Sequence, residues 1–440
     1  MSDIFAVGPL LILFIGALLL LLVDNIKAVS VSTFGALIGA ALCAVMAPAS
    51  TSTLLTPWLA FDKLSLFFTL LFLGIGVGVH LIGEKKAEFS FFLLSSIFGL
   101  ILIAMARDYL TLFLGLETLS ISLYVLCSFI KTSPTGAEAA FKYFLLGSVS
   151  TAILLFGIAL IYGATGTTKL IMPPQVDSLF LAGAGLVTVS LLFKAAIFPF
   201  HIWAPDVYAG APISVTALMA AGTKAGAFAA FVRIFMMSYS SLDQSLLAIA
   251  IFPTLIFANF VAMQQTELRR FFAYSSISHA GFLLIPIASG GPDALSSMLF
   301  YLVVYALATL GCFACLTFVE PTLDGVKGLF SSSPVLACCF SFCLLTLGGI
   351  PPSIGFFAKF YLLKAAFGQG YIALVILGLL TTIFAAFYYL RIVAALFAEP
   401  KTAQRSVVGG GAVASFIATS ALIALTIYPE PLLTILVAIK

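Results

Sequence analysis

Fourteen apolar stretches of transmembrane length succeed one another along this chain, and this pattern constrains its fold more than any other feature. A helix needs about 20 apolar residues to cross a bilayer. Only 8% of the residues are charged, against about 25% in soluble domains, so the chain has no soluble domain of ordinary size. We therefore predict an all-α polytopic membrane protein. The expected spans are 4–23, 28–48, 61–83, 87–106, 109–130, 136–162, 178–203, 212–237, 245–264, 270–290, 293–319, 333–367, 371–397 and 407–428.

The seventh and twelfth spans carry helix-breaking residues. Pro199 interrupts the seventh, which reads FKAAIFPFHIWAPD, and Pro351 interrupts the twelfth, which reads LGGIPPSIGFFAKF. Proline removes a backbone donor and clashes with the preceding turn. Interrupted spans at matching places in two halves indicate a transporter with inverted repeats. We expect one transmembrane domain over 1–440, with a first repeat over 87–237 (helices four to eight) and a second over 245–397 (helices nine to thirteen).

The basic residues of the short loops predict the orientation, because Lys and Arg favour the cytoplasmic side. With fourteen spans, both termini share one side. Ten basic residues lie opposite the termini and five lie with them, so both termini are expected outside the cytoplasm. The ten are Lys27, Lys85, Lys86, Lys131, Arg269, Arg270, Lys327, Arg391, Lys401 and Arg405, and the five are Lys63, Arg107, Lys169, Arg233 and Lys440.

Three ionisable residues lie too deep in their spans to reach water along their own helices. Lys224 is central in the eighth span, Lys194 lies well inside the seventh, and Glu117 lies inside the fifth. A charge at the bilayer centre costs about 2.5–3.5 kcal/mol on insertion scales, so such residues usually mark ion pathways. The ordinary alternative is a lysine that extends its amine to the interface, which we assign to Lys364 near the end of its span.

For three further residues, we consider both a functional role and an ordinary structural or interfacial role. Lys142 is six residues into its span, where extension to the interface and function are both open. Lys359 follows the break of the twelfth span, and we favour a functional role. His279 lies mid-span among hydroxyl residues, and it fits either a structural histidine or a proton relay. Desolvation disfavours the charged form of a buried amine, and a nearby carboxylate favours it, so such groups can exchange protons without a cofactor.

The cysteines allow two interpretations, a metal-binding site or ordinary buried residues. Cys312 and Cys315 form a C-x-x-C, and Cys338, Cys339 and Cys343 lie close in sequence. The first interpretation is an iron–sulfur or metal site. We favour small buried residues, because both groups fall inside apolar helices without a further ligand from a glycine-rich loop. No motif for nucleotide, haem or nucleic-acid binding is present in the sequence.

Several motifs, in order, resemble a known family. FKAAIFPFHIWAPDVYAGAP, LFLGLETLSISLYVL, AAFKYFLLGS, LRRFFAYSSISHAGFLL and LGGIPPSIGFFAKFYL are similar to the antiporter-like membrane subunits of proton-pumping NADH–quinone oxidoreductase, respiratory complex I, in their N-type form. The resemblance covers about residues 60–400. Ala209 departs from it, because a glutamate is more usual there.

The resemblance implies a proton-transfer role for six residues, which would form part of a hydrophilic axis along the membrane arm. They are Glu117, Lys142, Lys194, Lys224, His279 and Lys359.

The same resemblance implies the cellular setting. The chain is expected in a bacterial inner membrane, beside other membrane-arm subunits. No cofactor is expected in this chain, and quinone, FMN and iron–sulfur clusters are expected in partner subunits. The alternatives are a subunit of a multisubunit sodium/proton antiporter, a subunit of a ferredoxin- or hydrogenase-linked complex, and a structural scaffold. The central charge of Lys224 argues against a scaffold.

Overall fold

The computed structural model describes residues 2–23, 25–47, 57–239, 242, 244–399 and 409–439. Among these residues, twelve helices are long and apolar enough to cross a membrane, and two shorter apolar helices lie at the first and twelfth expected spans. The predicted all-α membrane fold is confirmed. Residues 48 and 407–408 of the expected spans lie outside the described residues, as do Lys401, Arg405 and Lys440 of the orientation count.

The chain packs into two compact units, which are Met1–Ala195 with Gly210–Leu242, and Ala196–Ala209 with Asp243–Lys440. The helices of the first unit are α1 Ser2–Leu20, α2 Ile26–Met46, α3 Lys63–Ile82, α4 Ala87–Met105, α5 Tyr109–Cys127, α6 Pro134–Thr165, α7 Ser178–Ala195, α9 Ile213–Leu218, the π-helix η1 Met219–Thr223, α10 Lys224–Phe231 and the π-helix η2 Val232–Ser238. Apart from Gly210, α8 Trp203–Gly210 belongs to the second unit, which also holds η3 Ser245–Leu247, α11 Ala248–Gln264, α12 Leu268–Ser289, α13 Ala294–Leu316, α14 Leu329–Ser332, α15 Pro334–Gly348, α16 Ile354–Gly368, α17 Ile372–Leu396, α18 Gly410–Ile427 and α19 Glu430–Val437.

Both irregular spans are broken. The seventh was expected to run to residue 203, but α7 ends at Ala195, and α8 begins only at Trp203. The twelfth consists of α15 and α16, with a turn at 349–353 between them. The eighth span, expected as one regular helix, has π-helical segments on both sides of α10. Such segments occur frequently at functional sites.

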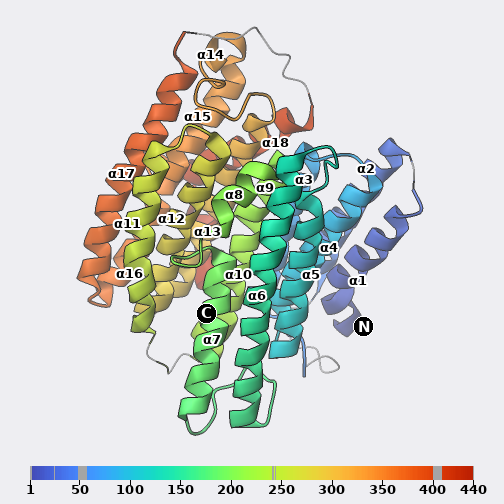
Figure 1. Cartoon of the computed structure of the whole chain (residues 1–440), viewed down its shortest axis with the longest axis vertical. Helices are drawn as coiled ribbons and strands as arrows, with labels where there is room; N and C mark the ends of the chain where they lie inside the picture. The colour runs from blue at the N-terminus through green and yellow to red at the C-terminus, as the bar shows by residue number, and fades with distance from the viewer. Residues whose placement is uncertain are drawn as a thin grey trace. The chain divides into compact units, whose positions relative to one another are not determined.

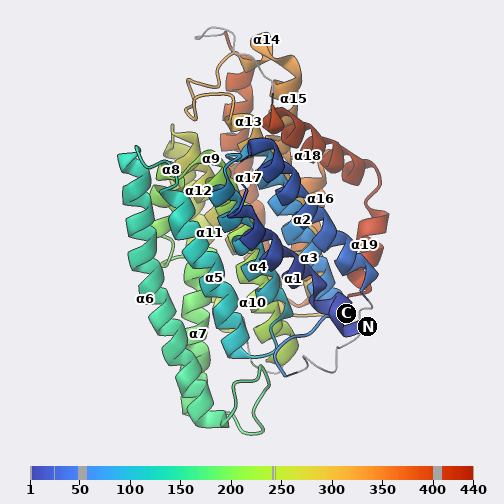
Figure 2. The same ribbon diagram turned by 90° about the vertical axis from the view of Figure 1, so that its right-hand side faces the viewer.

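Small residues let neighbouring helices of the first unit approach closely. A Cβ on Gly99 of α4 would lie 2.7 Å from the Gly115 carbonyl oxygen of α5, so neither position has room for a side chain. Gly157 of α6 and Gly183 of α7 meet in the same way, and Figures 1 and 2 show these two helices side by side. Close approach of this kind is how membrane helices gain packing energy. The second pair joins the helices that carry Thr151 and Lys194.

An ion pair fixes the start of α3 against η2. Arg233 donates from Nη1 to Asp62 Oδ2 at 2.6 Å and from Nη2 to Asp62 Oδ1 at 2.8 Å, and its Nε donates to the Ala104 carbonyl. Asp62 also caps α3 by accepting from the Ser65 backbone N–H. Burial opposes ionisation of Asp62, but Arg233 and Ser65 outweigh it and hold the pKa of the Asp62 carboxyl below its ordinary value near 3.8.

We predict that Arg233→Met lowers the unfolding free energy by roughly 3 kcal/mol, because it leaves a mostly buried carboxylate without its partner. The control Lys86→Met removes an exposed ion pair with Glu84 and should cost less than about 1 kcal/mol. Thermal melts of the purified chain in detergent measure both.

The same pair predicts a pH dependence. The pKa of Asp62 is lower in the folded state than in the unfolded state. The ionised Asp62 therefore contributes fully to the free energy of unfolding above about pH 4, and this contribution is lost as the pH falls through the pKa of the folded state. Equal melting temperatures for Arg233→Met and Lys86→Met at pH 7 would contradict the stabilising role of the Asp62–Arg233 ion pair.

Candidate functional site

Four of the six candidate residues lie in the first unit and two in the second. In the first unit, Glu117 of α5 and Lys194 of α7 face each other, with 3.8 Å between Glu117 Oε1 and Lys194 Nζ. The Lys194 side chain is 2% exposed and that of Glu117 is 20% exposed. The structure therefore brings together two of the ionisable residues that lie deep in their spans.

Two hydroxyl groups hold this pair in place. Lys194 Nζ donates to Ser120 Oγ at 2.7 Å, and Ser120 lies one turn after Glu117 on α5. Thr151 of α6 donates from Oγ1 to Glu117 Oε1 at 2.7 Å. The carboxylate and the amine thus share a polar network. Each of them lies closer to a neutral hydroxyl group, at 2.7 Å, than to its charged partner, at 3.8 Å. Neither hydroxyl residue was singled out from the sequence, because Ser and Thr are common in membrane helices and usually bond to their own backbone.

Lys224 bonds to the carbonyl group at which α7 ends. Its amine lies 2.7 Å from the Ala195 carbonyl oxygen, and the side chain is buried. In a continuous helix this carbonyl would accept from the N–H of residue 199, but residue 199 is proline and has none. The chain leaves the helix at Ala196, which has φ +56°, a left-handed conformation that costs an alanine roughly 1 kcal/mol. The break therefore frees an acceptor, and Lys224 uses it.

Lys359 in the second unit repeats this arrangement. Its amine lies 3.0 Å from the Gly348 carbonyl oxygen, at the end of α15. The N–H that this carbonyl would receive in a continuous helix belongs to residue 352, which is again a proline. Gly349 follows α15 with φ +71°, a left-handed conformation that favours glycine, and a Cβ there would lie 2.7 Å from Lys359 Cδ. The Phe282 ring lies 5.0 Å from the same amine.

His279 of α12 is buried between two tyrosines. Its Nδ1 lies 2.7 Å from the Tyr301 hydroxyl and its Nε2 lies 3.3 Å from the Tyr389 hydroxyl, which in turn bonds to Ser275. A neutral imidazole donates with one nitrogen and accepts with the other, so both ring nitrogens have a partner in either tautomer. A cavity of about 10 Å³ lies between His279 and Lys359, which is room for roughly one water molecule.

Lys142 forms an ion pair within α6. It pairs with Glu138 on the same helix, with 2.7 Å between Nζ and Oε1, and the two side chains are 41% and 63% exposed. Lys364, assigned to the interface from the sequence, is exposed on α16. The cysteines are free thiols, and Cys338 is exposed while Cys339 and Cys343 are buried. Within the described part of the chain, no group of three or more His, Cys, Asp or Glu side chains could hold a metal ion.

Comparisons with known proteins agree with this architecture. The family described as "NADH:quinone oxidoreductase/Mrp antiporter, TM" matches residues 106–385. NADH-quinone oxidoreductase subunit N of Protochlamydia amoebophila is 47% identical over 99% of this chain and 98% of its own length. The protein of the same name from Trichlorobacter lovleyi is 39% identical, over 83% of this chain and 80% of its own.

Two solved structures share the fold. A chain of respiratory complex I from Thermus thermophilus is 34% identical, covers 97% of this chain and 98% of its own length, and superposes with a TM-score of 0.87. A chain of the Mrp complex from Dietzia sp. DQ12-45-1b superposes with a TM-score of 0.89 over 100% of this chain and 96% of its own, at 20% identity, and this likeness concerns the fold alone.

The chain is thus an antiporter-like membrane subunit, and it belongs to the NADH:quinone oxidoreductase/Mrp antiporter family. Within that family it belongs to the N-type subunits of NADH–quinone oxidoreductases. The resemblance seen in the sequence motifs is confirmed.

We predict that Thr151→Val lowers turnover severalfold, because Glu117 loses a charge-assisted hydrogen bond of about 1.5–3 kcal/mol. In a Glu117→Gln background, the same substitution should have little further effect. The matched control is Thr188→Val, since the Thr188 hydroxyl donates to the Ala184 carbonyl of its own helix. Quinone reduction by the assembled complex measures all four variants. An equal loss from Thr151→Val in both backgrounds would show that Thr151 does not act through Glu117.

Proposed function

We propose that this chain moves protons across a bacterial inner membrane as the N-type subunit of a complex I-type assembly. Its neighbours would be other membrane-arm subunits, and quinone, FMN and iron–sulfur clusters would reside in partner subunits. Both termini would lie outside the cytoplasm, as the distribution of Lys and Arg suggests. The chain would contribute no redox centre and would couple quinone reduction elsewhere to proton movement.

The observation that supports this proposal best is the pair of amines held by interrupted helices. Lys224 and Lys359 are buried, and each bonds to one backbone carbonyl that a proline leaves without its helical donor. A charged amine donates strongly to that carbonyl, which also lies at the negative end of a helix dipole. A neutral amine interacts with it more weakly. A small displacement of the half-helix therefore changes the energy of protonating the lysine.

In the first unit, we propose that Glu117 and Lys194 take up and release the proton as a coupled pair, and that Lys224 is the next acceptor. A carboxylate that moves toward Lys194 favours the charged amine, and one that moves away favours proton release. The hydroxyl groups of Ser120 and Thr151 offer both members an alternative partner during such a movement.

In the second unit, we propose that His279 and Lys359 exchange a proton through the small cavity between them. One water molecule there could bond to both, and Tyr301 and Tyr389 would hold the imidazole in place. Lys142, with Glu138, belongs to the proposal as an outward-facing pair on α6 whose contribution is smaller.

A sodium/proton antiporter subunit is the second candidate function, since the fold alone is shared with the Mrp complex. The N-type sequence relatives favour the oxidoreductase assembly. Purification of the native complex and identification of the co-purifying subunits separates the two. Co-purification with quinone-reducing subunits supports the proposal, whereas an assembly composed only of antiporter subunits contradicts it.

We predict that Lys194→Ala and Glu117→Gln each lower proton pumping and quinone reduction together, severalfold, because the coupled pair can no longer exchange its proton. Lys142→Ala is the control and should lower both rates less, since its side chain is 41% exposed and pairs with Glu138. Proton uptake by proteoliposomes and the rate of quinone reduction are measured on complexes shown to be fully assembled. Normal pumping by an assembled Lys194→Ala complex would remove the pair from the mechanism.

A further inference from the structure

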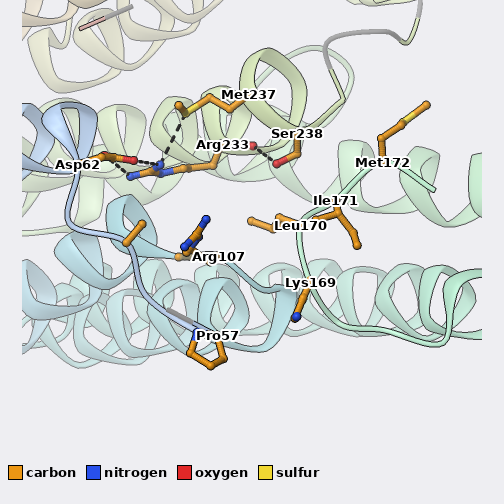
Figure 3. Close-up of a pocket in the computed structure, with 12 residues that line it drawn as sticks. Pro57, Asp62, Arg107, Lys169, Leu170, Ile171, Met172, Arg233, Met237 and Ser238 are labelled. Atoms are coloured by element: carbon orange, nitrogen blue, oxygen red, sulfur yellow. Dashed lines mark hydrogen bonds and ion pairs between the residues drawn. The ribbon is translucent and has the colours of Figure 1, made fainter. Parts of the chain in front are cut away.

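A cavity of about 650 Å³ opens in the first unit, and neither Lys194 nor Lys224 is among the described residues that line it. The described residues that line it include three cations, Arg107, Lys169 and Arg233, and one carboxylate, Asp62. Figure 3 shows these side chains around it, with the Asp62–Arg233 pair on one side. Three of the five basic residues on the side of the termini therefore converge on one cavity.

Backbone hydrogen bonds between three loops build the frame of this cavity. The Arg107 N–H donates to the Trp58 carbonyl at 2.8 Å, and the Arg107 carbonyl accepts from the Leu170 N–H at 2.9 Å. The Tyr109 N–H donates to the Thr168 carbonyl at 2.8 Å. Arg107 is thus fixed between the loop that precedes α3 and the loop that follows α6.

The two kinds of cation in the cavity have different roles. Arg233 is buried, and Asp62 and the Ala104 carbonyl occupy its guanidinium, so it forms a fixed wall. Arg107 and Lys169 are exposed at the ends of their loops. Arg107 and Lys169 therefore bring a planar guanidinium and a lysine amine to the cavity, and these are groups that suit a phosphate.

The position of the cavity suits a phosphate at the membrane surface. Most of its lining residues lie just beyond the ends of the apolar helices α3, α4 and α6, and the others belong to η2, the last segment of the eighth span. The hydrocarbon region gives way to headgroups at this level. Trp58, in the same loop as Pro57, is 57% exposed, and tryptophan is enriched at this level of a bilayer. Leu170, Ile171 and Met172 supply an apolar edge beside the charges.

We propose that this cavity binds a phosphate group through Arg107 and Lys169, either on the headgroup of an anionic lipid or as free phosphate. The apolar edge favours the lipid, because its acyl chains can follow that edge while the headgroup meets the cations.

The test titrates the purified full-length chain in detergent with dioleoylphosphatidylglycerol, dioleoylglycerol and inorganic phosphate, and reads bound ligand by native mass spectrometry. We expect one saturable phosphatidylglycerol and no saturable dioleoylglycerol. Arg107→Gln with Lys169→Gln should weaken binding about 30-fold, and Lys169→Gln alone about fivefold, from the usual contribution of a basic residue near anionic lipid.

Two control variants accompany this titration. Lys27→Gln with Lys131→Gln removes two exposed charges elsewhere and should leave the affinity unchanged. Arg107→Lys with Lys169→Arg keeps both charges and should retain binding.

Each outcome has a defined meaning. Saturable phosphatidylglycerol that millimolar inorganic phosphate does not displace identifies a lipid headgroup. Saturable inorganic phosphate, with phosphatidylglycerol no tighter than dioleoylglycerol, identifies free phosphate. If neither ligand binds saturably, or if Lys169→Gln and the double cavity variant bind as well as the Lys27→Gln, Lys131→Gln control, the proposal is wrong.

Discussion

A backbone carbonyl without a donor and a lysine amine without an acceptor are both costly inside a membrane, and here each satisfies the other. The hydrocarbon region offers no water to either group. Pro199 and Pro352 remove the N–H groups that Ala195 and Gly348 would receive in continuous helices. The lysines that bond to these carbonyls are thereby stabilised at depth. The broken helices and the buried charges are therefore two parts of one arrangement, since either alone would destabilise the membrane-embedded chain.

The two units reach this arrangement by different routes along the chain. Lys224 comes from the following span, 29 residues beyond its carbonyl partner, whereas Lys359 lies 11 residues beyond its own, on the second half of the same broken span. A carboxylate, Glu117, accompanies the lysines of the first unit, and an imidazole, His279, lies beside the lysine of the second. A carboxylate can neutralise an amine, while an imidazole can only exchange a proton with it. This difference suits the proposed functions of the two units. The first unit would take up a proton through a pair of coupled charges, and the second would pass a proton between groups that can both be neutral.

Hydrophobicity predicts the spans and the depth of Lys224 and His279, because both are properties of position along the chain. It does not predict that α7 ends at Ala195, which places Lys194 in the last turn of a half-helix. The hydroxyl groups of Ser120 and Thr151, and the tyrosines around His279, become neighbours only through helix packing. One signal was available in the sequence: Pro199 and Pro352 each follow by four residues a carbonyl group, of Ala195 and Gly348, and leave it without a helical donor. The cavity around Arg107 depends on three loops meeting, which no local pattern reveals.

The central claim is that the amine held by an interrupted helix gives and takes a proton rather than supplying a fixed charge. The most direct test measures protons pumped per quinone reduced in proteoliposomes that contain assembled complexes with Lys224→Arg, Lys224→His or Lys224→Leu. Arginine keeps the charge but does not release its proton, whereas histidine can still titrate. The account predicts that Arg and Leu both lower the ratio and that His retains part of it. A normal ratio with Lys224→Arg would contradict the account, because a fixed charge would then be sufficient at this position.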